Sequence, residues 1–219
     1  MKKIFLILSF LAVVSAAFSQ NEKYIKTMEE KVLAMDTTWS SAGLKDLANT
    51  FERIGNAEKN QWLPYYYAAL ANVNLGYTLA GNKMDGSAAA TVDPLADKAE
   101  QLIIKAEALS SNNSEIFVVK KMIASLRMMA DPMSRYMKYG PIAQEALTTA
   151  KKLNPDNPRI YLLEGQDKFF TPEQFGGSKE EAKKLFEETL KKSDAFKPES
   201  SIHPNWGRSV AQHFLSQIK

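Results

Sequence analysis

The stretch Ala143–Gly165, AQEALTTAKKLNPDNPRIYLLEG, contains the end of one helix, a turn and the start of a second helix. Small and apolar residues recur at helical spacing on both sides of the turn. In the turn, Asn157 precedes a proline at the first helical position, where asparagine caps a helix and the missing N–H of proline costs nothing. The stretch therefore predicts helices over about 141–153 and 158–168.

An earlier stretch, Ala99–Phe117, aligns with Ala143–Tyr161 without gaps. A third, weaker copy starts at Ala182. Repetition of helix pairs is the signature of a helical solenoid, in which each unit buries its apolar face against its neighbours. The matching positions are Ala99 with Ala143, Ala106 with Ala150, Leu109 with Leu153, Asn113 with Asn157, and Phe117 with Tyr161.

The rest of the chain after residue 20 also predicts helix. The alternation typical of strands is absent, and proline and glycine fall mostly between periodic runs or at their ends. Asp93–Pro94 repeats the cap signature of Asn157–Pro158 and predicts a helix start at 94. The longest expected loop is 81–93, which is rich in glycine, serine and alanine and is a surface insertion or a functional flap. The remaining helices are expected over 22–36, 41–56, 64–80, 94–109, 114–130, 179–193 and 205–217.

Two glycines, a serine and a lysine in Phe175–Ala182, FGGSKEEA, suggest either a phosphate-binding loop or a boundary between helices. A P-loop needs its lysine before the serine and a strand ahead of it, and neither is present. Ser178–Glu181 instead forms an S-x-x-E capping box, and its glutamates would repel an anion from the helix start. Thr171–Gln174 is a second capping box, expected to open a very short helix that ends at Gly176–Gly177.

The stretch Ala143–Gly165 resembles the junction between two tetratricopeptide repeats, with its alanines, proline and glycine where that family keeps them. The C-terminal runs FGGSKEEAKKLFEETL and FKPESSIHPNWGR resemble exported bacterial tetratricopeptide-like proteins of unassigned function. The copies begin at residues 99, 143 and 182, at spacings of 44 and 39 residues rather than the 34 of the family. The resemblance implies an all-α, irregular solenoid of αα-hairpins. Its clearest copies are about 94–130, 141–168 and 179–217.

The N-terminus has the layout of a secretory signal peptide. Two lysines precede Ile4–Ala17, an uncharged apolar run of 14 residues, and small residues follow. An uncleaved membrane anchor is the alternative, but the run is short for a membrane span. We expect a signal peptide over 1–19, or cleavage after Ala17, and one helical-repeat domain over 20–219 with no membrane span. The protein is then exported, to the periplasm or beyond the cell.

Composition argues against several kinds of chemistry. The 219 residues include no cysteine, which excludes disulfides and thiolate sites, and the net charge of +3 does not indicate a nucleic-acid binder. His203 and His213 lack further ligands at metal-binding spacing. Five methionines between Met122 and Met137 suggest either a copper(I) site or core packing, and we favour packing. We therefore expect no metal, no cofactor and no catalytic residues.

Three consecutive tyrosines, Tyr65–Tyr67, follow Trp62 and a proline expected at the first helical position. Three successive helical residues fan across about 200°, so they cannot all face one core. At least one tyrosine is expected to be exposed or to line a groove, although packing against a neighbouring repeat is the simpler interpretation. Tyrosine is also common in binding surfaces.

By the resemblance, the first helix of each pair lines a concave face, here the helices near 64–80, 114–130 and 158–168. Our candidates for partner contact are Tyr67, Asn74 and Gln166. The lysines with which clamp-type repeats grip a peptide C-terminus are missing at the matching positions. The leading hypothesis is a non-catalytic exported scaffold or adaptor for a protein or peptide partner. The alternative is a small-molecule binder with a cleft between helix pairs.

The signal peptide yields a direct prediction. Protein purified from the cell envelope should lack the first 19 residues, or the first 17, in an intact-mass measurement. A full-length mass, or a location confined to the cytosol, would contradict the expected export.

Overall fold

The computed structural model describes residues 22–83 and 85–218, and within these ranges every regular element is helical, with no strand. The predicted all-α class is therefore confirmed; the signal peptide lies outside the described residues. No helix in the described ranges has the length and apolar character needed to cross a membrane. A first helix over 22–37 is followed by α2 (Ser41–Glu58), α3 (Trp62–Ala80), α4 (Ala89–Leu109), α5 (Ser114–Met129), α6 (Pro132–Leu153), α7 (Pro158–Phe170), the short 3-10 helix η1 (Glu173–Phe175), α8 (Lys179–Ala195) and α9 (Arg208–Gln217).

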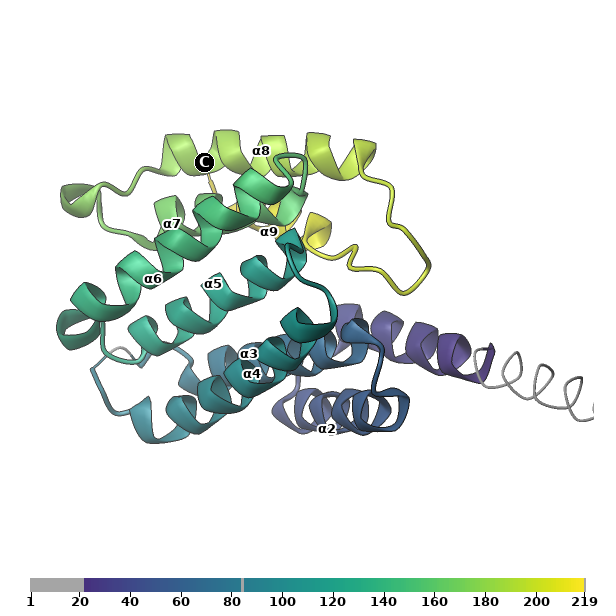
Figure 1. The fold of residues 1–219 in the computed structure, drawn as a ribbon. Helices are drawn as coiled ribbons and strands as arrows, with labels where there is room; N and C mark the ends of the chain where they lie inside the picture. The colour runs from purple at the N-terminus through teal and green to yellow at the C-terminus, as the bar shows by residue number, and fades with distance from the viewer. Residues whose placement is uncertain (1–21, 84, 219) are drawn as a thin grey trace, which may run out of the picture.

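The helices pack as successive pairs that stack in chain order (Figure 1). α3 packs against α2 and α4, α5 against α6, and α7 against α8, while α5 joins the first group to the second. Two glycines permit close approach between helices. A Cβ atom at Gly76 would lie 2.6 Å from Leu126 of α5, and one at Gly165 would lie 2.6 Å from Phe186 of α8.

Several predicted helix starts are confirmed by their hydrogen bonds. The Asn157 side chain accepts from the Arg159 N–H at 3.0 Å, and Ser178 Oγ accepts from the Glu181 N–H at 3.1 Å. The glycine-rich stretch before α8 is thus a helix boundary, and Gly176, with φ 91°, ends η1. The capping box predicted at Thr171 is wrong, because η1 starts after Pro172 without a side-chain cap.

The predicted start of α4 is wrong, since the helix begins at Ala89 and contains Pro94. A proline inside a helix removes one backbone hydrogen bond. Val92, one turn into the helix, is fully buried, and the burial of this side chain offsets that loss. The expected loop 81–93 accordingly ends before Ala89.

The predicted start of α6 at 141 is wrong for a related reason. The helix begins at Pro132, where Asp131 caps it by accepting from the Ser134 N–H at 3.3 Å, and it continues through Pro141. Arg135 in its first turn makes a bidentate ion pair with Asp93 of α4, at 2.6 and 2.9 Å. This ion pair holds the first turn of α6 against the start of α4.

A buried ion pair joins the middle of the stack. Glu115 opens α5 and Arg159 opens α7, and their side chains are almost completely buried. Arg159 donates to both carboxylate oxygens, from Nε at 2.7 Å and from a terminal nitrogen at 2.5 Å. Asn157 Nδ2 donates to the same carboxylate at 2.9 Å and to Ser114 Oγ at 3.1 Å.

The C-terminal segment, residues 196–207 between α8 and α9, packs on this network. Trp206 Nε1 donates to Tyr66 Oη at 2.8 Å, and its carbonyl accepts from Arg159 at 3.4 Å. Ile202 is buried in the main core, and the Phe196 ring centre lies 4.6 Å from the Arg159 guanidinium. The segment therefore covers the first turns of α3 and α7 even though it forms no helix itself.

Substitution of Arg159 tests how much the buried ion pair contributes to the stability of the fold. We expect Arg159→Ala to lower the free energy of unfolding by about 3–5 kcal/mol, because it leaves Glu115 buried without its partner. Arg208→Ala removes the exposed pair with Asp194 and should cost about 1 kcal/mol or less. Urea denaturation followed by circular dichroism measures both, and similar losses in the two variants would contradict the assignment.

Candidate functional site

The predicted contact residue Tyr67 is buried, with 2 % of its surface exposed. Its ring stacks on Phe51 of α2 at 5.2 Å, and its hydroxyl donates to the Ile202 carbonyl of the C-terminal segment at 3.0 Å. The expectation that one of the three tyrosines is exposed or lines a groove is wrong, because Tyr65 and Tyr66 are buried too. Tyr67 therefore offers no surface to a partner in this structure.

The three tyrosines are buried because α3 is covered in three directions. Tyr65 Oη donates to Asn56 Oδ1 of α2 at 3.2 Å, and Tyr66 Oη lies 3.5 Å from the Glu115 carboxylate of α5. The C-terminal segment covers the third direction, at Tyr67. Burial raises the pKa of Tyr66 and Tyr67, with the nearby Glu115 carboxylate adding to the effect, so both hydroxyls stay protonated and can donate.

The other two candidates, Asn74 and Gln166, are half-buried on α3 and α7. Asn74 lies two turns after Tyr67, while Gln166 stands on α7, and no hydrogen bond among the described residues joins the three. Their role in partner contact stays a prediction, now without Tyr67.

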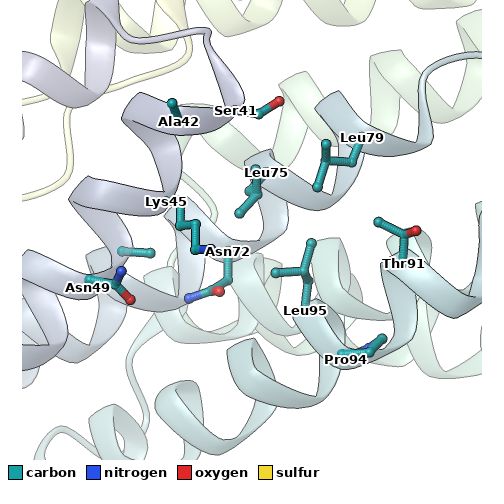
Figure 2. A pocket seen from close by; sticks show the side chains of 11 residues that line it. Ser41, Ala42, Lys45, Asn49, Asn72, Leu75, Leu79, Thr91, Pro94 and Leu95 are labelled. Carbon is teal, nitrogen blue, oxygen red and sulfur yellow. The ribbon is translucent and has the colours of Figure 1, made fainter.

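An open groove of about 500 Å³ lies between α2, α3 and α4, on the side of α3 that faces away from Tyr66 (Figure 2). We call it the α2–α4 groove. Its walls are mainly apolar, and its polar residues come mostly from α2. The lining residues are Ser41, Ala42, Lys45, Ala48, Asn49, Asn72, Leu75, Leu79, Thr91, Pro94 and Leu95.

The antiparallel packing of the helices orders these residues along the groove. α2 and α3 are joined by a short turn, so Asn49 stands level with Asn72 and Ser41 with Leu79. One turn beyond Asn49, Lys98 of α4 pairs with Glu52 of α2 at 2.6 Å and bridges the two helices across the groove. The groove thus extends from its two asparagines, next to this ion pair, to Leu79.

Sequence reasoning missed this groove, although α3 carried a signal for it. The helix is apolar on every side, which predicts that other elements cover it all round. Leu79 is nevertheless 42 % exposed, so the covering is incomplete where the groove opens. An apolar helix that its neighbours leave partly uncovered is the pattern that could have indicated a cleft.

The two histidines lie in different parts of the fold. No group of three or more histidine, aspartate or glutamate side chains in the described ranges is placed to hold a metal ion. His203, in the C-terminal segment, packs edge-on against Trp62 at 5.6 Å, and its Nδ1 is buried without a hydrogen bond. His213 is exposed on α9 beside Gln217.

The methionines between 122 and 137 do not form one cluster. Met122 is buried in the main core, in agreement with the packing interpretation. Met133 and Met137, on the first turns of α6, are almost fully exposed. A shared copper(I) site would need their sulfur atoms to converge, which this separation between core and solvent opposes.

The fold and groove together define an all-helical protein of stacked helix pairs with an open, mainly apolar groove between α2, α3 and α4. Comparison with family models found no match, and comparison with curated proteins found none. Among solved structures, the chain is similar to the HusA haemophore from Porphyromonas gingivalis. The two share 32 % sequence identity with a TM-score of 0.75, over 90 % of this chain and 92 % of the other. The chain therefore belongs to the same family as HusA.

His203 predicts how stability depends on pH. Burial lowers the pKa of His203 below its usual value of 6.5; Glu199 and Glu115 act in the opposite direction, and Arg159 acts with burial. Above pH 6.5 the imidazole is neutral in both folded and unfolded chains. Below it the unfolded chain takes up the proton first, so the folded state should lose stability as the pH falls.

We expect His203→Gln to flatten the fall in melting temperature between pH 7.5 and 5.5. His213→Gln, which changes the exposed histidine of α9, is the control. If the two variants show the same pH dependence as the unaltered protein, His203 does not anchor the C-terminal segment in its neutral form.

Proposed function

We propose that this chain is an exported, non-catalytic binding protein that carries haem, or a similarly flat apolar molecule, in the α2–α4 groove. The proposal favours the small-molecule alternative over the scaffold for a protein partner. Its main support is the family relationship to a haemophore, which extends over almost the whole of both chains. Export is supported by the predicted signal peptide over 1–19.

The groove has a suitable size and lining. Sites for small molecules are commonly clefts of about 300–1,000 Å³ with mainly apolar walls and a few polar groups that set orientation. The α2–α4 groove, at about 500 Å³, lies within that range. Leu75, Leu79 and Leu95 provide its apolar area, and the burial of this area against a flat ring is expected to supply most of the binding free energy.

The groove lining suggests how haem would be held. Haem iron in proteins is usually bound by histidine, cysteine, methionine or tyrosine. The eleven residues that line the groove include none of these. On this proposal haem is cargo, held through its macrocycle and its edge groups and not through a protein ligand to the iron, which suits a protein that must release it again.

The predicted tetratricopeptide character is part of the same proposal. Stacked helix pairs and the close packing of Gly165 against α8 support an irregular tetratricopeptide-like arrangement. In this arrangement the inner face at α3 and α7 is occupied by the C-terminal segment, and the cleft available to cargo lies between α2 and α4.

Groove binding is tested with a pair of matched leucines. Haemin titrated into the purified protein should quench tryptophan fluorescence and shift the Soret band. Leu79→Asp should weaken this binding at least about 10-fold, equal to about 1.4 kcal/mol. Leu109 ends α4 outside the groove and has nearly the same exposure, 40 % against 42 %, so Leu109→Asp should leave the affinity unchanged. Absence of haemin binding, or equal losses in both variants, would contradict the proposal.

A further inference from the structure

We infer that the part of the α2–α4 groove lined by Lys45, Asn49 and Asn72 binds a carboxylate of the cargo. The cargo class is then a flat apolar molecule with a carboxylate at its edge, which enters carboxylate first. This inference rests on the proposed function, because it assumes that the groove is the cargo site.

The ammonium and amide groups of the lining lie toward one end of the groove. Lys45 and Asn49 lie one turn apart on the same face of α2, and Asn72 faces them from α3. In Figure 2 the Lys45 amine and the two amides lie toward one side, while Leu79 and Thr91 lie toward the other. A molecule in the groove would therefore meet ammonium and amide donors at one end, and mainly aliphatic walls with the hydroxyl residues Ser41 and Thr91 along the rest of its length.

Lys45 is the one ionisable side chain among the residues that line the groove. Within the described ranges it makes no ion pair, unlike Lys98, which pairs with Glu52. The remaining charge at this end is therefore a single positive one. Lys45 and Asn49 are exposed, so both side chains are accessible to a carboxylate that enters the groove.

Asn72 is the clearest sign that this end is built for a polar group. Only 7 % of its surface is exposed, yet asparagine on an otherwise apolar helix face is unfavourable unless its amide is satisfied. Its Nδ2 donates to the Ala68 carbonyl at 2.8 Å, and its Oδ1 accepts no hydrogen bond from the described part of the chain. That oxygen can hold the Lys45 ammonium toward the groove, which leaves the remaining ammonium hydrogens and the Asn49 amide to bind the carboxylate.

The decisive experiment compares haemin with haemin dimethyl ester, which has the same ring and iron but no free carboxylate. The unaltered protein should bind the ester about 10-fold more weakly than haemin. Lys45→Met, which keeps the aliphatic stem and removes the charge, should reduce haemin affinity about 10-fold and leave ester affinity unchanged. Lys45→Arg should retain the preference for haemin.

Lys152→Met is the matched control, since Lys152 is exposed on α6 and lies outside the groove. It should bind both compounds as the unaltered protein does. If haemin and its ester bind equally well, or if Lys45→Met weakens both to the same extent, the carboxylate site is refuted while haem binding stands. If haemin does not bind at all, the proposed function fails and this inference fails with it.

Discussion

The buried pair of Glu115 and Arg159 is the interaction on which the arrangement of the helices most depends. Removing two charges from water is costly, and the cost is offset only when the geometry is good and further hydrogen bonds complete the shell. Here two hydrogen bonds join the pair and Asn157 adds a third to the carboxylate. Because Tyr66 and Trp206 complete the network, α3, α5, α7 and the C-terminal segment are held in one register.

The same pair shows that the repeated sequence includes a residue that contacts the neighbouring copy, as well as the residues that start and end the helices. Glu115 and Arg159 are 44 residues apart, the spacing of the first two copies, so they occupy equivalent positions in consecutive units. The asparagines before them, Asn113 and Asn157, are also equivalent and cap α5 and α7 in the same way. The stacking of the units places these equivalent positions next to each other. The opposite charges of Glu115 and Arg159 then favour the contact between α5 and α7. A gapless alignment of the copies contains the information needed to predict this contact.

Local signals predicted most helices, and what they missed depends on tertiary contacts. The caps at Asn157 and Ser178 depend on neighbouring residues alone and were predictable. The starts of α4 and α6 were not, because buried Val92 and the Arg135–Asp93 tie keep the chain helical before an internal proline. The C-terminal segment has no periodicity, so nothing local indicated that it would cover Tyr67. The groove was missed for the same reason, since its lining comes from three helices.

The C-terminal segment also determines which surface remains for binding. In a helical solenoid the inner face is the usual site for an extended partner. In this chain Ile202 and Trp206 cover α3 on the side of Tyr66 and Tyr67, with hydrogen bonds and buried apolar area that a peptide there would have to displace. On the opposite side of α3 the covering by α2 and α4 is incomplete, and apolar surface is left open near Leu79. The two sides of α3 therefore differ in kind: one completes the core, and the other has the size and lining of a small-molecule site.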